Sequence, residues 1–564
     1  MNFSFEMNTR KENTMEEEKR LWEACKDGKL EEVIKLLQIE QIDTNWQDSE
    51  WKRTPFYVAC GYGHIDIVKV LLNDKRVDIN KSQSQGATPF FIACDKGHID
   101  IVKLLLNNER VDINKADNRY GQTPFYVACE KGHIEIVKLL LLNNGRVNTK
   151  KADDDGTTPF WTACYNGHIE IVKLLLNNKR MNVNEPDNDG ETPFYIVCQE
   201  GHIEIVELLL NSKRIDINKG NKNGVTPFRI ACEKGDIDIV KLLLNDNRVD
   251  INKVDNDGWT PFYVACESEN IDVVKLLLNS ERVVDTNKGD AYDKTAFYIA
   301  CEKGYIEIVK LLLSKGWIDI NKADHAGWSP FYMVCLQGNI EIIKLLLNDE
   351  RVDINQIENK NEQTPFFTAC QEGKIEIVKL LLSDKRVKTN KADKYGCTAF
   401  YTACWDGDIK IVQLLLNDQR IDVNKTEHTD GKTPLFIACD EGHIDIVKLL
   451  LNDQRVSINK QKIFRTNFTI LHYTCYNGDI KSLQHILAMG KEVNVNVEDG
   501  QGLTPIDIAK QEKENQKRSE EIRNYTEIIE LLESFKINPN ETRTKLRIQL
   551  GSAGKSIHFF YFIF

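Results

Sequence analysis

The fifteen cysteines are the residues of this chain with the widest range of possible chemistry, since thiols bind metals, form disulfides and act as nucleophiles. Thirteen of them lie six residues after a recurring threonine or serine: Cys60, Cys94, Cys129, Cys164, Cys198, Cys232, Cys266, Cys301, Cys335, Cys370, Cys404, Cys439 and Cys475. Cys25 takes the same place near the N-terminus, and Cys397 lies outside the pattern. Equivalent positions in stacked helices are roughly 8–10 Å apart, whereas a disulfide needs Cα atoms within about 7 Å. We therefore predict small buried apolar residues in a reducing compartment, rather than disulfides or a metal site.

Six histidines recur as well, each directly after a glycine: His64, His98, His133, His168, His202 and His443. Other copies of the pattern place Asp236, Tyr305, Asn339, Lys374 or Asp408 there, so a regular metal array does not follow. We expect these residues to begin helices. No Ser/His/Asp set or carboxylate pair stands out from the charged surface, and we therefore expect no enzyme activity, no cofactor and no metal ion.

The elements that hold these residues form a repeated unit of 34 to 36 residues. Its anchor residues are Thr54, Thr88, Thr123, Thr158, Thr192, Thr226, Thr260, Thr295, Ser329, Thr364, Thr398, Thr433 and Thr469, with a weaker copy at Thr504. A fixed period in this range is the sequence signature of a solenoid. In one unit Thr88 caps a first helix, Pro89 occupies its first turn and Gly97 ends it. A second, leucine-rich helix is predicted over 98–106.

The motif Thr123-Pro124-Phe125-Tyr126-Val127-Ala128-Cys129, followed by Gly132-His133, resembles the ankyrin repeat, with its Thr-Pro-Leu-His-x-Ala-Ala and Gly-His signatures. The resemblance covers roughly residues 21–535. It implies an all-α solenoid of about fifteen helix–turn–helix units, joined by β-hairpin-like loops into a curved superhelix. Two departures are systematic: aromatic residues replace Leu-His, and the glycine after the second helix is missing. We expect Asn73 and its equivalents to take the left-handed conformation in place of that glycine.

The two ends of the array differ from its middle. We expect a polar N-terminal segment (1–20), a degenerate capping repeat (21–46), regular repeats (47–460), divergent repeats with a charged insertion (461–535) and a non-repeat tail (536–564). The unit at Ser268-Glu269-Asn270 lacks the glycine between its helices, and a local distortion is expected there. The insertion over 510–523 is expected to extend a first helix or to loop out.

The tail carries a partial nucleotide-binding motif. The stretch 544–556 resembles a strand running into the phosphate-binding loop of P-loop proteins, and Gly554-Lys555-Ser556 match the end of that motif. Gln549 stands where the first glycine belongs. The alternative function is therefore the regulatory N-terminal part of a larger, truncated P-loop nucleotide-binding protein.

Composition favours an interaction protein over other classes. The formal net charge is −12, and no basic stripe with interleaved aromatic residues occurs, so we expect no nucleic-acid partner. No stretch approaches the ~20 apolar residues of a membrane span. We expect a monomer in the cytoplasm, with the nucleus as the alternative location.

The binding surface should lie where residues vary on a constant scaffold. Such positions lie directly before the anchor and just before the glycine between the helices. A discontinuous strip is predicted from Trp259, Trp328, Trp405, Tyr165, Leu336 and Tyr476, because tryptophan is a frequent interface anchor. The alternative is that these side chains are partly buried against adjacent loops. We predict a protein–protein interaction scaffold or adaptor that binds other proteins through its concave, loop-bearing face; a mechanical spring is a further alternative.

Overall fold

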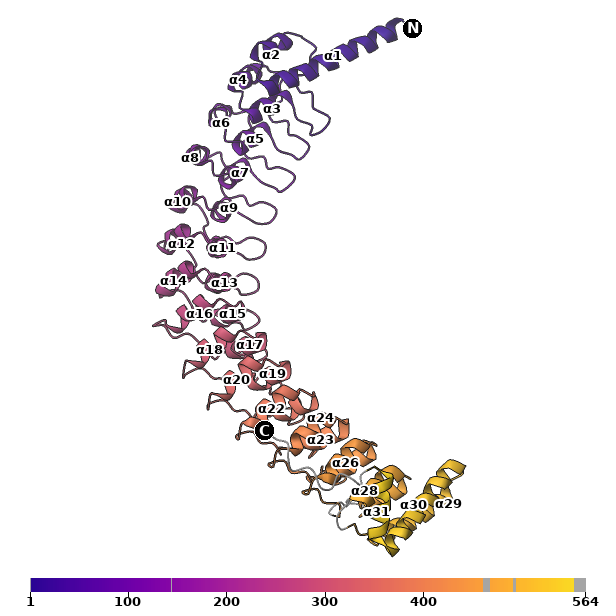
Figure 1. The fold of residues 1–564 in the computed structure, drawn as a ribbon. Coiled ribbons are helices and arrows are strands. Elements are labelled where there is room, and N and C mark those ends of the chain that lie inside the picture. Colours follow the sequence, from indigo (N-terminus) through magenta and orange to yellow (C-terminus); the bar gives the residue numbers. More distant parts are fainter. Residues whose placement is uncertain (1, 144, 460–466, 490–492, 552–564) are drawn as a thin grey trace. The chain divides into compact units, whose positions relative to one another are not determined.

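The computed structural model describes residues 2–143, 145–459, 467–489 and 493–551. Those residues form thirty-one helices and no strand, which confirms the all-α repeat class (Figure 1). The chain divides into two compact units, Met1–Thr286 and Asn287–Phe564, and each is described by itself.

The first unit holds sixteen helices in successive pairs. They are α1 (Asn2–Asp27), α2 (Leu30–Leu37), α3 (Pro55–Tyr62), α4 (Ile65–Asn73), α5 (Pro89–Asp95), α6 (Ile99–Leu106), α7 (Pro124–Glu130), α8 (Ile134–Leu142), α9 (Pro159–Tyr165), α10 (Ile169–Asn177), α11 (Pro193–Glu200), α12 (Ile203–Leu210), α13 (Pro227–Lys234), α14 (Ile237–Asn245), α15 (Pro261–Glu267) and α16 (Ile271–Leu278). From α3 onward the first helices of the pairs form one row and the second helices another, and the loops project beyond the first row (Figure 1).

The second unit continues the same pattern and ends with one additional helix. Its helices are α17 (Ala296–Lys303), α18 (Ile306–Leu313), α19 (Pro330–Gln337), α20 (Ile340–Leu347), α21 (Pro365–Gln371), α22 (Ile375–Ser383), α23 (Ala399–Asp406), α24 (Ile409–Leu416), α25 (Pro434–Asp440), α26 (Ile444–Asn452), α27 (Ile470–Tyr476), α28 (Ile480–Met489), α29 (Pro505–Asn515), α30 (Ser519–Ile537) and α31 (Pro539–Gln549). The charged insertion therefore extends the first helix of its repeat, α29, to Asn515.

Each first helix begins as its sequence indicates. The Oγ1 of Thr88 accepts a hydrogen bond of 3.1 Å from the Phe91 amide, and Pro89 fills the position where a missing N–H costs nothing. Gly97 ends this segment with φ of +76°, a conformation that a Cβ disfavours. A Cβ there would also lie 2.7 Å from the His133 ring of the next repeat. The Gly-His pair thus serves two neighbouring repeats at once.

The recurring histidines begin the second helices, as predicted, and they also connect consecutive repeats. The Nε2–H of His133 donates to the Asp95 carbonyl of the preceding first helix at 2.9 Å, and His168 donates to the Glu130 carbonyl at 2.8 Å. Lys374 makes the same connection through its ammonium, which donates to the Leu336 carbonyl at 2.6 Å. These residues therefore satisfy the last carbonyls of a helix, which have no partner within that helix.

A recurring arginine performs the same task for the second helices. Arg214 donates to the carbonyl oxygens of Leu176, Asn178 and Met181 at 2.5, 3.2 and 2.5 Å. The expected left-handed turn at Asn73 is wrong: Asn73 is the last residue of α4, and Asp74 follows with φ of −81°. In repeats such as that of α10, a guanidinium from the next repeat caps carbonyls at the end of the second helix; after α4, the corresponding Arg110 donates to the Val77 carbonyl at 3.4 Å.

The repeat that lacks its central glycine keeps ordinary helices. Glu269 takes the left-handed conformation with φ of +58°, and α15 and α16 keep lengths of 7 and 8 residues. The local distortion expected in this repeat is therefore confined to the backbone of Glu269.

The tail contradicts the predicted strand. Residues Pro539–Gln549 form α31, which packs on α28 and α30. Asn538 caps it by accepting from the Glu541 amide at 3.3 Å, and Leu546 is buried. Arg547 donates through Nε to the Ala488 carbonyl at 2.9 Å. Gly554-Lys555-Ser556 lie outside the described residues.

All fifteen cysteines are buried, which confirms the prediction of small buried residues, and all are free thiols. Burial in apolar surroundings raises the pKa of thiols such as Cys129 and Cys198 well above the ordinary range. Tertiary packing thus leaves the thiols protonated.

Replacing Arg214 with alanine is expected to lower the free energy of unfolding by about 1–2 kcal/mol, because a charged donor to three carbonyls is lost. Native-state hydrogen exchange should show the largest increase at the end of α10. Lys213→Ala, one residue away, is the control and should leave exchange in α10 unchanged. Equal exchange in both variants would show that the guanidinium does not stabilise the stack.

Candidate protein-binding face

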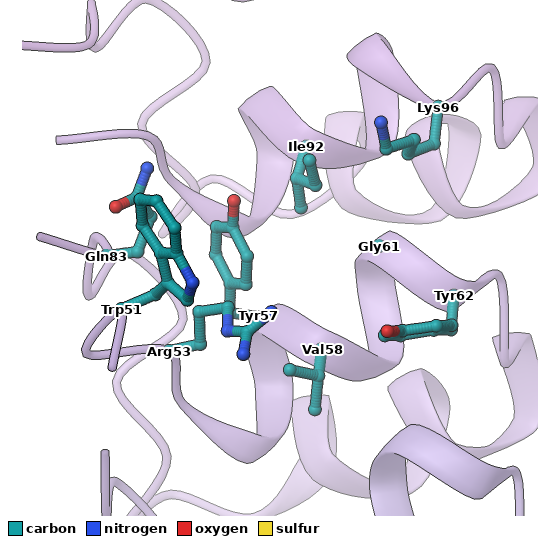
Figure 2. A pocket seen from close by; sticks show the side chains of 9 residues that line it. All are labelled: Trp51, Arg53, Tyr57, Val58, Gly61, Tyr62, Gln83, Ile92 and Lys96. Carbon is teal, nitrogen blue, oxygen red and sulfur yellow. The ribbon is translucent and has the colours of Figure 1, made fainter. Parts of the chain in front are cut away.

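A first groove lies in the first unit between the loops and the first helices α3 and α5 (Figure 2). Its volume is about 330 Å³, and it is lined by Trp51, Arg53, Tyr57, Val58, Gly61, Tyr62, Gln83, Ile92 and Lys96. Trp51, Arg53 and Gln83 lie toward the loops, while Tyr62 and Lys96 lie at the opposite end (Figure 2). Trp51 and Tyr62 are 41% and 51% exposed, so aromatic surface is open to solvent at both ends.

The charged side chains that line this first groove are cationic. Arg53 pairs with Asp48 at 2.7 Å and lies over the Trp22 ring, 5.4 Å from its centroid. Lys96 pairs with Asp95 at 2.9 Å. Burial raises the pKa of Tyr57, so its phenol stays neutral and can donate or accept. The groove therefore offers aromatic surface beside two cations that are each paired with an aspartate.

A second, larger groove lies within the second unit, along α21, α23 and α25 and their loops. Its volume is about 660 Å³. It is lined by Asn361, Gln363, Phe367, Gln371, Asp393, Tyr395, Cys397, Tyr401, Thr402, Trp405, Asp406, Glu427, Thr429, Asp430, Lys432, Ile437, Asp440 and Glu441. Cys397, the cysteine outside the repeat pattern, is buried in its wall, and burial raises its pKa to about 12.

The two grooves are built from equivalent repeat positions. Counting from the anchor Thr or Ser as zero, each groove uses the loop tip at −3, the residue at −1, the helix residues at +3 and +4, and the helix end at +7 and +8. We call this set of positions the binding face. The scaffold thus presents one surface repeatedly, while the side chains on it change from repeat to repeat.

Two carboxylates of the second groove hold its loops. Asp393 accepts from the amides of Tyr395 and Cys397 at 3.0 and 2.9 Å. Glu427 accepts from the amides of Asp430 and Lys432 at 2.7 and 3.0 Å. Burial raises the pKa of Asp393, whereas the backbone donors hold the pKa of Glu427 below its usual value against its burial. These carboxylates fix the shape of the loop tips.

The structure places the six predicted binding residues differently. Tyr165, Trp405 and Tyr476 are exposed, and Trp259, Trp328 and Leu336 are partly buried. Of the six, Trp405 lines one of the two grooves described above. Tyr165 and Trp259 belong to the first unit and the other four to the second. Their assembly into one strip stays a prediction.

Two of the partly buried tryptophans pack against their own first helices. The Trp259 ring lies 5.4 Å from Tyr263, and the Arg229 guanidinium lies 5.8 Å from its centroid. Trp328 stacks on Tyr332 with ring centroids 5.7 Å apart. Such packing matches the alternative of partial burial for these two residues.

Sequence reasoning missed the aromatic residues at the loop tips. Exposed aromatic side chains occur at position −3 in four repeats: Trp51, Tyr120, Tyr292 and Tyr395. Their backbone also supports the face, since the Tyr395 carbonyl accepts from the His428 amide of the next repeat at 2.8 Å. The signal was present in the sequence, because position −3 varies from repeat to repeat.

Other kinds of site find no support in the described part of the chain. No group of three or more His, Cys, Asp or Glu residues among the described positions is arranged to hold a metal ion. Among the same residues, no helix combines the length and apolar character needed to cross a bilayer.

Comparison with known proteins agrees with this architecture. A family model described as "Ankyrin repeats (3 copies)" matches in overlapping segments that together run from residue 21 to 499. The chain is 39% identical over 57 residues to "Ankyrin repeat domain-containing protein 7" of Homo sapiens, a match that covers 10% of this chain. The chain spans about a fifth (22%) of the length of that relative. With helix pairs repeated through both units and family matches over most of its length, the chain belongs to the ankyrin repeat family.

Proposed function

We propose that the chain is a scaffold or adaptor that binds partner proteins through the binding face. Ankyrin repeats are generally protein–protein interaction modules. The observation that supports the proposal is the presence of two grooves at equivalent repeat positions with different linings. The helices, and the hydrogen bonds between consecutive loops, already fix these positions. Binding therefore requires little ordering of the scaffold. Each groove can therefore select a different partner or a different part of one partner.

We further propose that the protein is a monomer in the cytoplasm. Its free, buried thiols favour a reducing compartment such as the cytoplasm. The P-loop alternative gains no support from the described residues, since a helix replaces the strand that such a loop requires.

The test places a photo-crosslinking amino acid at one position at a time in the full chain. Tyr62 and Trp405 probe the binding face; Lys69 and Lys379, exposed on second helices, probe the opposite side. In lysate from the native source, the two face positions should give crosslinks to other proteins, and the two second-helix positions should give few. Equal crosslinking from Lys69 and Lys379 would contradict the proposed face.

A further inference from the structure

The second groove combines a buried aromatic floor with exposed aromatic rings. Phe367 and Tyr401 are buried in the floor, whereas Tyr395 at a loop tip and Trp405 at the end of α23 are 55% and 48% exposed. The rings of Tyr401 and Trp405 meet edge to face with centroids 6.2 Å apart. The Lys394 ammonium, which donates to the Lys360 carbonyl at 2.7 Å, lies 5.0 Å from the Tyr395 ring centroid, so a cation and an aromatic ring already meet at the edge of this groove.

The charge of this groove is strongly negative. Its lining includes six carboxylates and one ammonium, that of Lys432. Lys432 is paired with Asp440 at 2.9 Å, and Asp440 also accepts from the Tyr473 hydroxyl. Asp393 and Glu427 already accept hydrogen bonds from backbone amides of the loops.

Three carboxylates remain, and they come from different elements. Asp406 lies at the end of α23, Asp430 at a loop tip and Glu441 directly after α25. In the described part of the chain, these three side chains form no ion pair or side-chain hydrogen bond, and His443 is the cationic neighbour that acts on Asp406. Partial burial raises the pKa of Asp406, so its charge is poorly solvated and an opposite charge nearby would be favoured.

The first groove provides the contrast on the same scaffold. At equivalent positions its charged lining residues are Arg53 and Lys96, with no carboxylate. Charge complementarity mainly decides which partner a face accepts and how quickly it associates. Arg53 and Lys96 are already paired with Asp48 and Asp95, so a basic partner meets unpaired carboxylates at the second groove and none among the lining residues of the first.

We propose that the second groove binds a lysine- or arginine-containing extended segment of a partner protein. One cationic side chain of the segment lies against the exposed ring of Trp405, and neighbouring cations face Asp406, Asp430 and Glu441. A volume of about 660 Å³ accommodates a few such side chains. This inference rests on the proposed function, because it names the partner chemistry of one part of the binding face.

The experiment measures fluorescence anisotropy of a labelled peptide with alternating arginine and glycine, using the full chain. Its counterpart with glutamate in place of arginine is the charge control. Trp405→Ala should weaken binding of the arginine peptide about tenfold, because the desolvated cation–π contact is lost. Asp406→Asn/Glu441→Gln should weaken binding further and flatten its dependence on salt.

Matched variants separate the groove from the general acidity of the chain. Glu376→Gln/Asp445→Asn makes the same change in net charge on second helices of the same unit. Trp51→Ala removes an exposed tryptophan from the first groove, at the loop-tip position that Tyr395 holds in the second groove. Both should bind the arginine peptide like the unchanged protein, and circular dichroism should show the same helix content in every variant.

Two outcomes would overturn the inference: no preference for the arginine peptide over the glutamate peptide, or equal weakening by the groove variant and by Glu376→Gln/Asp445→Asn. In either case, protein crosslinks from Trp405 would leave the proposed function standing and reject only the basic partner. Absence of crosslinks from both Tyr62 and Trp405 would reject the proposed function itself.

Discussion

Raising the pH from 8.5 to 10.5 is expected to lower the free energy of unfolding steeply, by about 10 kcal/mol per pH unit from the buried thiols of the first unit alone. The first unit buries eight thiols: Cys25, Cys60, Cys94, Cys129, Cys164, Cys198, Cys232 and Cys266. Burial raises their pKa in the folded state, whereas an exposed thiol has a pKa of about 8.5. Above that pH the unfolded chain loses protons that the folded chain retains, so ionisation favours the unfolded state. Below about pH 7 the thiols are protonated in both states and stability should not depend on them.

The size of the slope follows from the number of thiols. Each one contributes about 1.4 kcal/mol per pH unit once it is ionised in the unfolded state. Urea unfolding followed by circular dichroism at closely spaced pH values measures the slope. The control replaces Cys129, Cys164, Cys198 and Cys232 with alanine, which should reduce the slope by about 5 kcal/mol per pH unit whatever the variant's stability at pH 7. Buried tyrosines such as Tyr195 have a raised pKa as well and remain in both proteins. Identical slopes would show that the thiols do not cause the alkaline loss of stability.

The parts of the fold that the sequence predicted are those determined within one repeat. A threonine cap acts over three residues and a glycine ends its own helix, so Thr88 and Gly97 could be interpreted from a single unit. The period of the pattern then fixed the class, since helices this short and apolar must be covered by neighbouring repeats. Burial of the cysteines followed from the same argument.

The parts that the sequence missed depend on contacts between repeats. His133 and Arg214 reach carbonyls 38 and 33 to 38 residues earlier in the chain, and no local pattern reveals those partners. The left-handed turn expected at Asn73 was wrong, since Asn73 is still part of α4. The strand expected in the tail was wrong because local composition was weighed without the Asn538 cap and without the burial of Leu546 against α28 and α30.

The candidate site could be predicted by position but not by chemistry. Variation at +7 pointed to Trp405, whereas the loop-tip residue Tyr395 was overlooked. The capacity of the second groove to bind a cation depends on which carboxylates already accept hydrogen bonds from backbone amides and which do not. Asp393 and Asp406 look alike in the sequence, and only their hydrogen bonds distinguish them.

Replacing Phe194 with alanine is expected to lower the free energy of unfolding by about 3–5 kcal/mol. Phe194 is 1% exposed in α11, which packs between α9 and α13, so the shortened side chain leaves a cavity with few ways to collapse. Stability in a repeat array is a sum of repeat and nearest-neighbour contributions. The loss should therefore appear as faster hydrogen exchange in α9, α11 and α13, with little change in repeats farther away.

The chain itself supplies the matched control. At the equivalent position of a later repeat the residue is Leu435, which is equally buried, so the scaffold accepts leucine there. Phe194→Leu should cost less than about 1.5 kcal/mol, because most of the apolar volume is kept. Urea unfolding of the two variants gives the comparison directly. A loss from leucine as large as that from alanine would mean that the aromatic ring makes a specific contact that volume alone does not replace. A small loss from both would mean that this repeat relaxes around the gap and that the first row of helices is less tightly packed than its burial indicates.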